Sequence, residues 1–270
     1  MDRYLVIGNP IAHSLSPEIH ARFARSLGER ISYERLRVDP EEFDAQVRGC
    51  FDEGVRGANV TLPFKLRAFN VATRITDRAQ LARAANFLAA RDGVIEADNT
   101  DGAGLVADLT RNLGLQLRGA RIVLLGAGGA ARGVVGPLLD EGPEWLTVAN
   151  RTHERAIELR HGFPAHSPMR VCPLDRVPAD ATLVINATST STLGQDLALP
   201  EGTLRAGMFA YDMAYGPSAR AFVERARSAG AHASDGLGML VEQAAESYYL
   251  WRGLRPETGP VLAELRTLVA

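Results

Sequence analysis

The sequence has 270 residues, of which 46% are hydrophobic and 23% charged, with a formal net charge of -2 and a pI near 6.3. This length allows two ordinary domains or one large one, and the composition is typical of a globular protein. No basic block occurs, so nucleic acid is not an expected partner. The apolar runs are too short and too rich in glycine to span a membrane, and no signal peptide is recognisable. A cytoplasmic protein is expected.

Strand-like and helix-like segments alternate from the N-terminus. Strands are expected at residues 3–8, 31–38 and 57–61, and helices at 16–28 and 40–54. Ser16 is expected to cap the first helix, with Pro17 at its first position and Gly28 just past its end. Because strands and helices alternate, a mostly parallel sheet covered by helices is predicted.

The second half repeats the alternation and then ends in helices. A helix is expected at 101–114 and a strand, glycine turn and helix at 120–142, followed by strands at 145–152, 182–189 and 208–215 and helices at 238–253 and 256–270. This order predicts an α/β protein with two lobes and a cleft between them, the final helices packing back on the first lobe. The expected units are residues 1–100 joined by 238–270, and residues 101–237.

Two cysteines, Cys50 and Cys172, are isolated in the sequence, and Cys50 shares a helical face with Phe43 and Val47. Both are interpreted as small core residues rather than as a disulfide or as metal ligands. No metal site is expected.

A glycine motif follows the strand predicted near residue 121. Gly126, Gly128 and Ala131 fit the pattern G-x-G-x-x-G/A, which permits a tight turn and lets backbone N–H groups approach a pyrophosphate at a helix N-terminus. A plain strand-to-helix turn is the alternative. About 20 residues further on, where an NAD enzyme carries a carboxylate, this chain has Asn150, Arg151 and Thr152.

Arginine at this position favours a phosphorylated cofactor. A guanidinium binds a 2′-phosphate through charge-assisted hydrogen bonds, whereas a carboxylate would repel the phosphate. Arg155 follows one helical turn after Arg151. The sequence therefore predicts NADP(H) rather than NAD(H), although a solvated surface role is the alternative for Arg151.

Lys65 is the only lysine in the chain, beside 29 arginines. Reduction of a ketone by hydride leaves an alkoxide that needs a proton and a nearby positive charge; arginine supplies only the charge, whereas lysine supplies both. Asp101 is a suitable partner for Lys65, and its alternative role as a helix cap is compatible with that pairing. Chance survival of one lysine in an arginine-rich chain is the alternative for Lys65.

Two serines precede the first helix. Ser14 and Ser16, together with the helix N-terminus, form a reasonable site for a carboxylate. His13 and His20 have no partner at a spacing typical of a metal site or a catalytic triad, so both are interpreted as structural. Residues 185–189 end a later strand, where ligands of doubly wound sheets bind.

Taken together, these segments resemble the shikimate dehydrogenase family. The matching stretches cover nearly the whole chain and occur in this order: GNPIAHSLSP (8–17), GANVTLPFK (57–65), AAN (84–86), DNTDG (98–102), GAGGAARG (126–133), NRT (150–152), INATS (185–189), YDMAY (211–215) and DGLGMLVEQAA (235–245). The resemblance implies the reversible reduction of 3-dehydroshikimate to shikimate with NADPH, a step in the biosynthesis of chorismate and the aromatic amino acids.

The resemblance also implies roles around the substrate. Lys65 is implied to be the proton donor, paired with Asp101. The substrate carboxylate would be held by Ser14, Ser16 and Thr61, with Tyr215 facing it. Asn86 and Gln243 would bind ring hydroxyls, with Asn59 supporting the pocket.

Further roles are implied along the cofactor. Residues implied to hold the pyrophosphate are Gly126, Ala127, Gly128, Gly129 and Ala130. The 2′-phosphate would bind to Asn150, Arg151, Thr152 and Arg155, while Thr188, Ser189, Met213, Gly236 and also Asp77 would lie along the cofactor. The expected partner is a small-molecule substrate, and the expected assembly is a monomer or a homodimer.

The chain departs from the family pattern at two places. Phe87 stands where the family usually has threonine, and the segment after Ser189 lacks the usual Gly-Met pair. Both changes are expected to affect affinity or preference rather than catalysis.

Two other functions are weighed. A quinate/shikimate dehydrogenase that also uses NAD would place an acidic residue near 150–152, and none occurs there. A catalytically silent NADP-binding sensor would have no need for Lys65, Asp101 and the serine pair together.

Overall fold

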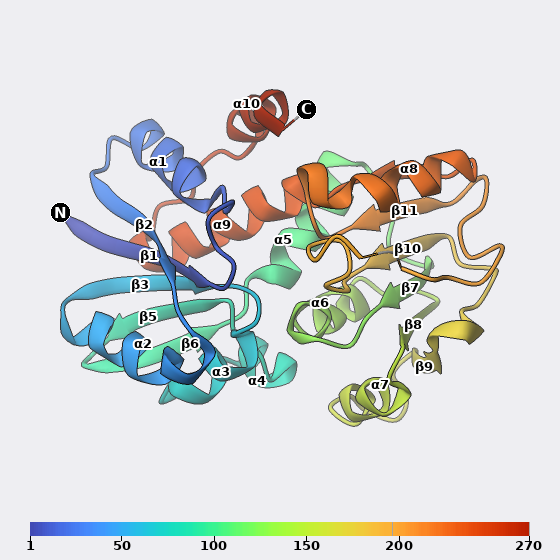
Figure 1. Cartoon of the computed structure of the whole chain (residues 1–270), viewed down its shortest axis with the longest axis horizontal. Coiled ribbons are helices and arrows are strands. Elements are labelled where there is room, and N and C mark those ends of the chain that lie inside the picture. Colours follow the sequence, from blue (N-terminus) through green and yellow to red (C-terminus); the bar gives the residue numbers. More distant parts are fainter. Residues whose placement is uncertain (196, 270) are drawn as a thin grey trace.

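The computed structural model describes residues 1–195 and 197–269, which form two α/β lobes (Figure 1). The first lobe contains β1 (Asp2–Gly8), β2 (Ile31–Arg37), β3 (Val55–Val60), β4 (Arg74–Ile75), β5 (Phe87–Arg91) and β6 (Val94–Asp98). These strands form one sheet in the order β2-β1-β3-β5-β6-β4. β1 is parallel to β2 and β3, whereas β5 is antiparallel to both β3 and β6. The predicted parallel arrangement thus holds for the first three strands, and β4 to β6 are additional to the expected ones.

The β5–β6 hairpin turns at Asp92 and Gly93, which have φ of 53° and 78°. Two residues with positive φ are typical of a type I′ turn, and Asp-Gly between apolar runs is its usual sequence signal. The hairpin places Asn86 and Asp101, just outside its two ends, next to each other at the edge facing the second lobe.

Four helices belong to the first lobe: α1 (Ser16–Ser26), α2 (Phe43–Asp52), α3 (Lys65–Val71) and α4 (Asp77–Ala82). A 3₁₀ turn, Pro40–Glu42, precedes α2, so the helix expected from residue 40 begins three residues later. Buried Phe43, Val47, Phe64 and Ala68 pack beneath the sheet. Gly28, with φ of +68°, ends the first helix as predicted.

The predicted cap of α1 is wrong. Ser16 is the first helical residue and makes no capping bond, and Leu15 holds the N-cap position. Instead the Ser16 amide donates to Ser14 Oγ at 3.3 Å. Ser14 therefore satisfies a free N–H group of the helix, and the Ser16 hydroxyl is left beside it at the helix mouth.

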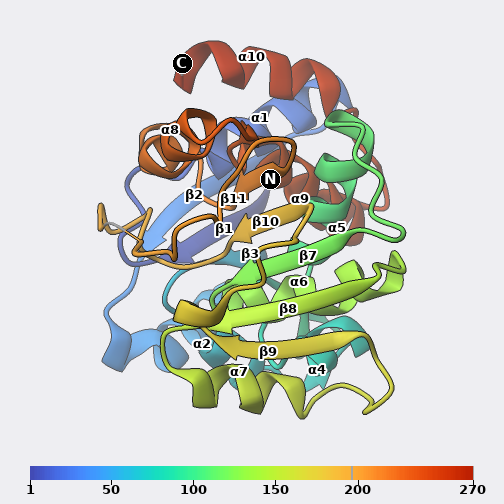
Figure 2. The same cartoon turned by 90° about the vertical axis from the view of Figure 1, so that its right-hand side faces the viewer.

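The second lobe is a six-stranded parallel sheet with the order β12-β11-β10-β7-β8-β9 (Figure 2). Its strands are β7 (Arg121–Leu125), β8 (Trp145–Asn150), β9 (Met169–Pro173), β10 (Leu183–Asn186), β11 (Phe209–Asp212) and β12 (His232–Ser234). Its helices are α6 (Gly129–Asp140), α7 (His153–Arg160) and α8 (Arg220–Ser228), with short 3₁₀ turns at Leu174–Arg176 and Gly216–Ala219. This is the strand order of a dinucleotide-binding fold, which binds its ligand where the order reverses, between β7 and β10.

Two long segments run between the lobes. These are α5 (Asp101–Ala107), continued by a π-helical turn at Asp108–Asn112, and α9 (Leu237–Arg252), which is followed by α10 (Gly259–Val269) (Figure 1). A Cβ on Gly104 of α5 would lie 2.7 Å from the Gln243 Cβ, so the two helices pack closely there. Val241 and Tyr248 of α9 pack against Phe23 of α1, which confirms that the C-terminal helices return to the first lobe.

Candidate active site

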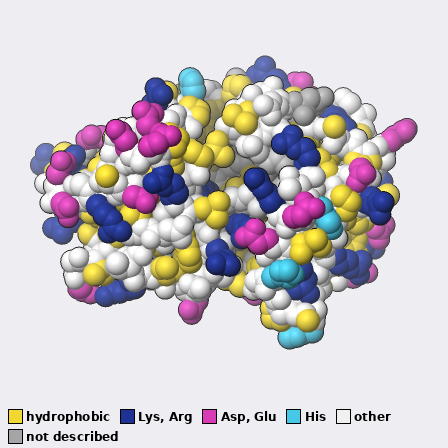
Figure 3. Space-filling view, turned by 60° about the horizontal axis from the view of Figure 1, so that its bottom comes forward, with side chains coloured by type: hydrophobic (Ala, Val, Ile, Leu, Met, Phe, Trp, Pro, Cys, Tyr) yellow, Lys and Arg dark blue, Asp and Glu magenta, His cyan; other side chains and the backbone are white. Residues whose placement is uncertain are grey.

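A cavity of about 650 Å³ lies between the two lobes, where the surface is hollowed in Figure 3. All nine residues predicted to act on or bind the substrate line it: Ser14, Ser16, Asn59, Thr61, Lys65, Asn86, Asp101, Tyr215 and Gln243. They come from both lobes and from segments more than 200 residues apart. The fold therefore brings together every member of that predicted set.

Lys65 and Asp101, which both line this cavity, form an ion pair. Each is the first residue of a helix, α3 and α5, and Lys65 Nζ donates to Asp101 Oδ2. The side chains are 16% and 5% exposed, so the pair is shielded from bulk water but open to the cavity. The Asp101 carboxylate faces Lys65 and makes no helix-capping bond.

Asn86 holds the other oxygen of this carboxylate. Its Nδ2 lies 3.0 Å from Asp101 Oδ1, 3.1 Å from Gln243 Oε1 and 2.8 Å from Thr100 Oγ1. Its Oδ1 accepts from the Thr100 backbone N–H at 2.7 Å. An amide has only two N–H groups, so these three acceptors share them. Asn86 and Gln243 thus sit next to the Lys65–Asp101 pair.

The Asn59 side chain holds the backbone of Asn86 through a hydrogen bond. Asn59 Nδ2 donates to the Asn86 carbonyl at 3.2 Å and to Ser247 Oγ at 2.9 Å, and its Oδ1 accepts from Tyr33 OH at 2.8 Å. Burial raises the pKa of the Tyr33 phenol well above its usual value, so it stays a neutral donor. Asn59 therefore links β3, α9 and the residue before β5.

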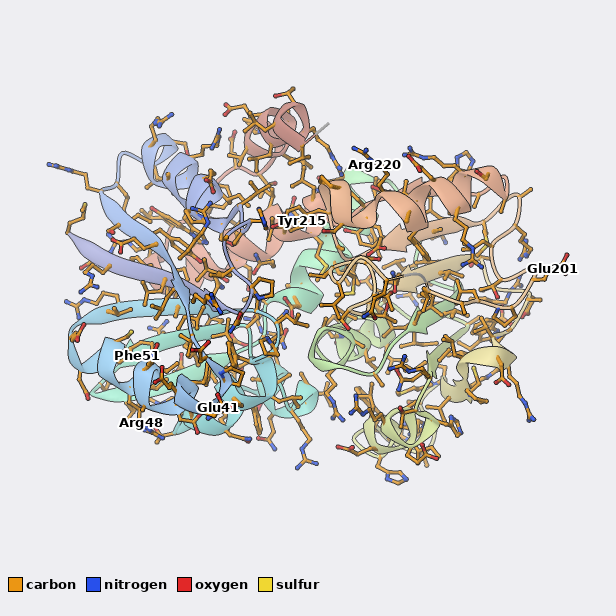
Figure 4. The ribbon with its side chains drawn as sticks, in the orientation of Figure 1. Glu41, Arg48, Phe51, Glu201, Tyr215 and Arg220 are labelled. Atoms are coloured by element: carbon orange, nitrogen blue, oxygen red, sulfur yellow. The ribbon has the colours of Figure 1, made fainter. Side chains whose placement is uncertain are left out.

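Ser14, Ser16 and Tyr215 form one end of the cavity. Ser14 Oγ donates to Ser16 Oγ at 3.2 Å, and Arg35 fixes the loop because its Nη2 donates to the Ser14 carbonyl at 2.6 Å. Tyr215 comes from the second lobe and lies between the lobes in Figure 4. Burial raises the pKa of the Tyr215 phenol, so it can donate a hydrogen bond at neutral pH. Three hydroxyls at a helix N-terminus suit a carboxylate.

The glycine loop after β7 fits a dinucleotide. Gly126 has φ of +106°, and a Cβ there would lie 3.1 Å from the Ala187 carbonyl oxygen, so only glycine is suitable. A Cβ on Gly128 would meet open space, and no side chain caps α6, which leaves its first N–H groups free for a pyrophosphate. Gly129 and Ala130 line the cavity, Ala127 is buried beside them, and Ala131 packs in the core.

The carboxyl end of β8, next to β7, carries the residues predicted to bind a 2′-phosphate. Arg151, Thr152 and Arg155 are exposed there, outside the cavity, and Asn150 Nδ2 donates to the Thr152 carbonyl at 2.7 Å. Within residues 1–195 and 197–269, neither arginine forms an ion pair. Both guanidinium groups are therefore available to an anion. Asp77 is exposed at the start of α4 and, like Arg151 and Arg155, does not line the cavity.

Three family models match successive parts of the chain. The model of the shikimate dehydrogenase substrate-binding domain matches residues 6–88, that of shikimate/quinate 5-dehydrogenase matches 108–212, and that of the shikimate 5′-dehydrogenase C-terminal domain matches 236–266. A shikimate dehydrogenase (NADP(+)) of Verminephrobacter eiseniae is 52% identical, over 100% of this chain and 96% of that protein. This chain belongs to the shikimate dehydrogenase family.

Solved structures agree with this membership. The Thermus thermophilus shikimate 5-dehydrogenase in complex with NADP(H) and shikimate is 32% identical and has a TM-score of 0.87, covering 99% of both chains. A 5-ketofructose reductase of Gluconobacter sp. strain CHM43, solved without ligand, is 26% identical with a TM-score of 0.82, covering 99% of this chain and 98% of that one. The fold therefore also occurs in a reductase named for a different substrate.

The departure from the family pattern at Phe87 lies away from the cavity. Phe87 is 1% exposed, stacks on Trp251 with ring centroids 5.1 Å apart, and does not line the cavity. Trp251 Nε1 donates to the Leu88 carbonyl at 3.1 Å. Asn86 immediately precedes β5 and lines the cavity, whereas Phe87, the first residue of the strand, does not. The expectation that this ring affects substrate affinity is therefore not supported.

The second departure lies after Ser189, in a loop that contacts the end of β11. Ser191 Oγ donates to Asp212 Oδ2 at 2.6 Å and accepts from Asn186 Nδ2 at 3.0 Å. Burial raises the pKa of the Asp212 carboxyl. These contacts join the loops that follow β10 and β11. Thr188, Ser189, Met213 and Gly236, which are expected to lie along the cofactor, line the cavity. Thr192 also lines it.

Several lining residues carry no signal in the sequence. Thr192, Leu240 and Val269 reach the cavity only through tertiary packing, and His13, interpreted as structural, is exposed at its wall. His20 is buried and stacks on Tyr33 with ring centroids 4.1 Å apart, as a structural residue does. In the described part of the chain, no cluster of three His, Cys, Asp or Glu side chains is suited to a metal ion, and no helix is long and apolar enough to span a membrane.

Proposed function

We propose that this chain catalyses the reversible NADP(H)-linked interconversion of 3-dehydroshikimate and shikimate. One observation carries the proposal: the Lys65–Asp101 ion pair lies between a hydroxyl-rich carboxylate site and the free N-terminus of α6, in a single cavity. Substrate, acid and cofactor can therefore meet at one point. Homologues named as NADP-dependent shikimate dehydrogenases support it.

The donor set fits NADP(H). Free N–H groups at the start of α6 suit the pyrophosphate, and Arg151 and Arg155, with Asn150 and Thr152, suit the 2′-phosphate. When bound, the cofactor supplies the hydride. Thr188, Ser189, Met213 and Gly236, which line the cavity with Gly129 and Ala130, are proposed to lie along the cofactor. Asp77, exposed at the start of α4, is also proposed to lie along the cofactor.

Lys65 moves the proton. In the reduction, Lys65 Nζ donates to the ketone oxygen as negative charge develops on it, and in the oxidation the neutral amine accepts the proton of the hydroxyl. Asp101 holds the ammonium in place, and Asn86 holds Asp101. A positioned proton donor of this kind contributes about 10²–10⁴-fold to the rate.

The remaining side chains orient the substrate. Ser14, Ser16, Thr61 and Tyr215 would hold its carboxylate through hydroxyl donors, which fixes one end of the ring. Asn86 and Gln243 would exchange their mutual hydrogen bond for bonds to the ring hydroxyls. Since a 3.1 Å amide contact is already formed there, the two groups are preorganised for this exchange.

Further proposals concern organisation. Residues 1–100 with 238–270 are proposed as the substrate unit and 101–237 as the cofactor unit, supported by one sheet in each range and by the ranges of the matching family models. A cytoplasmic location and a monomeric or homodimeric state are proposed for a biosynthetic enzyme acting on a small soluble acid.

The test is the change in absorbance at 340 nm with the purified chain. Four mixtures combine NADP⁺ or NAD⁺ with shikimate or quinate. Turnover confined to NADP⁺ with shikimate is expected. Equal rates with NAD⁺ or with quinate would favour a quinate/shikimate dehydrogenase of relaxed cofactor use. Absence of turnover in all four, with NADPH still bound, would contradict the proposal and favour the sensor.

A further inference from the structure

The last helix reaches from the first lobe to the second. α10 packs on α1 and α9 through Val261 and Leu265, yet its C-terminal end points toward the second lobe (Figure 1). There Arg266 Nη1 donates to Asp235 Oδ1. Asp235 follows β12, the last strand of the second sheet, and its side chain is 14% exposed. This ion pair therefore links α10 to the second lobe.

The Asp235 carboxylate in turn accepts hydrogen bonds from two backbone segments that form part of the cavity wall. Its Oδ2 accepts from the Gly216 N–H at 2.9 Å, and its Oδ1 accepts from the Leu237 N–H at 3.4 Å. Gly216 follows Tyr215, and Leu237 follows Gly236; both preceding residues line the cavity. One carboxylate thus fixes the turn that presents the Tyr215 phenol and the start of α9.

The end of α10 also forms part of the cavity wall. Val269 lines the cavity, and a Cβ on Gly216 would lie 3.6 Å from the Val269 Cβ. Another ion pair of the same helix has no such connection: Glu264 Oε2 lies 2.8 Å from Arg22 Nε of α1, and neither residue lines the cavity. Docking of α10 and support of the turn can therefore be separated.

We propose that Arg266 is a positioning residue for substrate binding, which acts through Asp235 on the turn carrying Tyr215. It rests on the proposed function because the ligand it serves is the substrate carboxylate. Without the guanidinium, the Asp235 carboxylate loses its charged partner and is free to turn away from Gly216. The phenol would then be held less well, and binding would weaken before the chemical step.

The experiment compares Arg266→Gln with Glu264→Gln in the full chain. Shikimate oxidation with NADP⁺ gives KM and kcat, and hydrogen exchange reports the backbone amide of Gly216. For Arg266→Gln we expect KM for shikimate to rise about tenfold, as for loss of one charged hydrogen bond, with kcat and KM for NADP⁺ nearly unchanged and faster exchange at Gly216. For Glu264→Gln we expect wild-type values.

An unchanged KM in Arg266→Gln, or an equal rise in Glu264→Gln, would overturn the proposal, because α10 would then act only by docking. A raised KM with normal exchange at Gly216 would overturn the route through Asp235. If the wild-type chain shows no turnover with shikimate, exchange alone decides: faster exchange at Gly216 in Arg266→Gln only supports the proposal, and unchanged exchange overturns it.

Discussion

Asn86 Nδ2 lies 3.0 Å from Asp101 Oδ1, while the other oxygen of the same carboxylate accepts from Lys65. Because Asn86 precedes β5 and Asp101 begins α5, this contact depends on the β5–β6 hairpin, which brings the two segments together. The orientation of Lys65, the proposed acid, is thus set through Asp101 by Asn86, a side chain that also lines the cavity.

Asp101→Asn keeps the size of the side chain but removes the charge that holds Lys65. We expect kcat to fall about 10²-fold and the unfolding temperature to fall as well, because Lys65, whose side chain is 16% exposed, loses its charged partner. Steady-state kinetics and thermal unfolding check this. The matched control is Asp98→Asn, three residues earlier, where the carboxylate pairs with Arg78 outside the cavity.

Asp98→Asn should lose stability rather than turnover, by about 1–3 kcal/mol, because a 5%-exposed carboxylate that accepts from Arg78 and Thr76 is replaced while Arg78 keeps its ion pair with Glu246. If Asp101→Asn turned over normally, the role given to Asp101 would be excluded.

Arg151→Ser removes a guanidinium from the proposed 2′-phosphate site. We expect KM for NADP⁺ to rise about 10–100-fold, the cost of losing one or two charge-assisted hydrogen bonds, and KM for NAD⁺ to stay constant. Arg25→Ser in α1, which removes an exposed charge of the first lobe, is the control. Equal increases in KM for both cofactors would argue against a 2′-phosphate contact.

Phe87→Thr restores the residue usual in the family. We expect a loss of about 3–5 kcal/mol in the free energy of unfolding, since a 1%-exposed ring stacked on Trp251 is deleted from the core. KM for shikimate should stay near the wild-type value, because the ring does not line the cavity. Urea unfolding and kinetics check the two parts. A tenfold change in KM for shikimate would show that Phe87 does influence the substrate.

His20 makes stability depend on pH. Burial lowers the pKa of its imidazole to about 3, while its value in the unfolded chain is near 6.5. The unfolded state therefore takes up a proton below pH 6.5 that the folded state refuses until about pH 3. The stability that neutral His20 contributes is complete above pH 6.5 and is lost progressively as the pH falls toward 3.

Lowering the pH from 7 to 5 should reduce the free energy of unfolding by about 2 kcal/mol through His20 alone. Urea unfolding of wild type and His20→Leu at both pH values isolates it, because all other groups cancel in the difference. His161→Gln, which changes an exposed histidine, should behave as wild type. If the free energy of unfolding of His20→Leu fell between pH 7 and 5 as much as that of the wild type, other groups would be responsible for the acid sensitivity.

Much of the fold follows from local sequence signals. Alternating apolar strands and capped helices predict two α/β lobes, and the glycine motif predicts the parallel sheet of the second one. The β5–β6 hairpin has its own signal in Asp92-Gly93 but was not among the expected elements. Strands β4, β9 and β12, which are two, five and three residues long, are also absent from the expected elements, because pairing with neighbours rather than local pattern stabilises them.

Some residues of the site carry a signal in the sequence, and others do not. Lys65 stands out in composition, and Gly126 because only glycine adopts its backbone conformation. The prediction that Ser16 caps α1 is wrong, because the Ser14 hydroxyl, two residues earlier, accepts from a free N–H group of the helix, that of Ser16. Val269 and Arg266 could not be predicted, since their place depends on how α10 docks some 250 residues after α1 begins.

Lys65→Arg tests the central claim most directly, because it keeps the charge beside Asp101 and removes only the ability to exchange a proton. Measured as NADP⁺-dependent oxidation of shikimate at 340 nm, kcat is expected to fall about 10²–10⁴-fold while NADPH still binds and the unfolding temperature is unchanged. Near-normal turnover by Lys65→Arg would contradict the account, because a side chain that cannot give up a proton would then suffice.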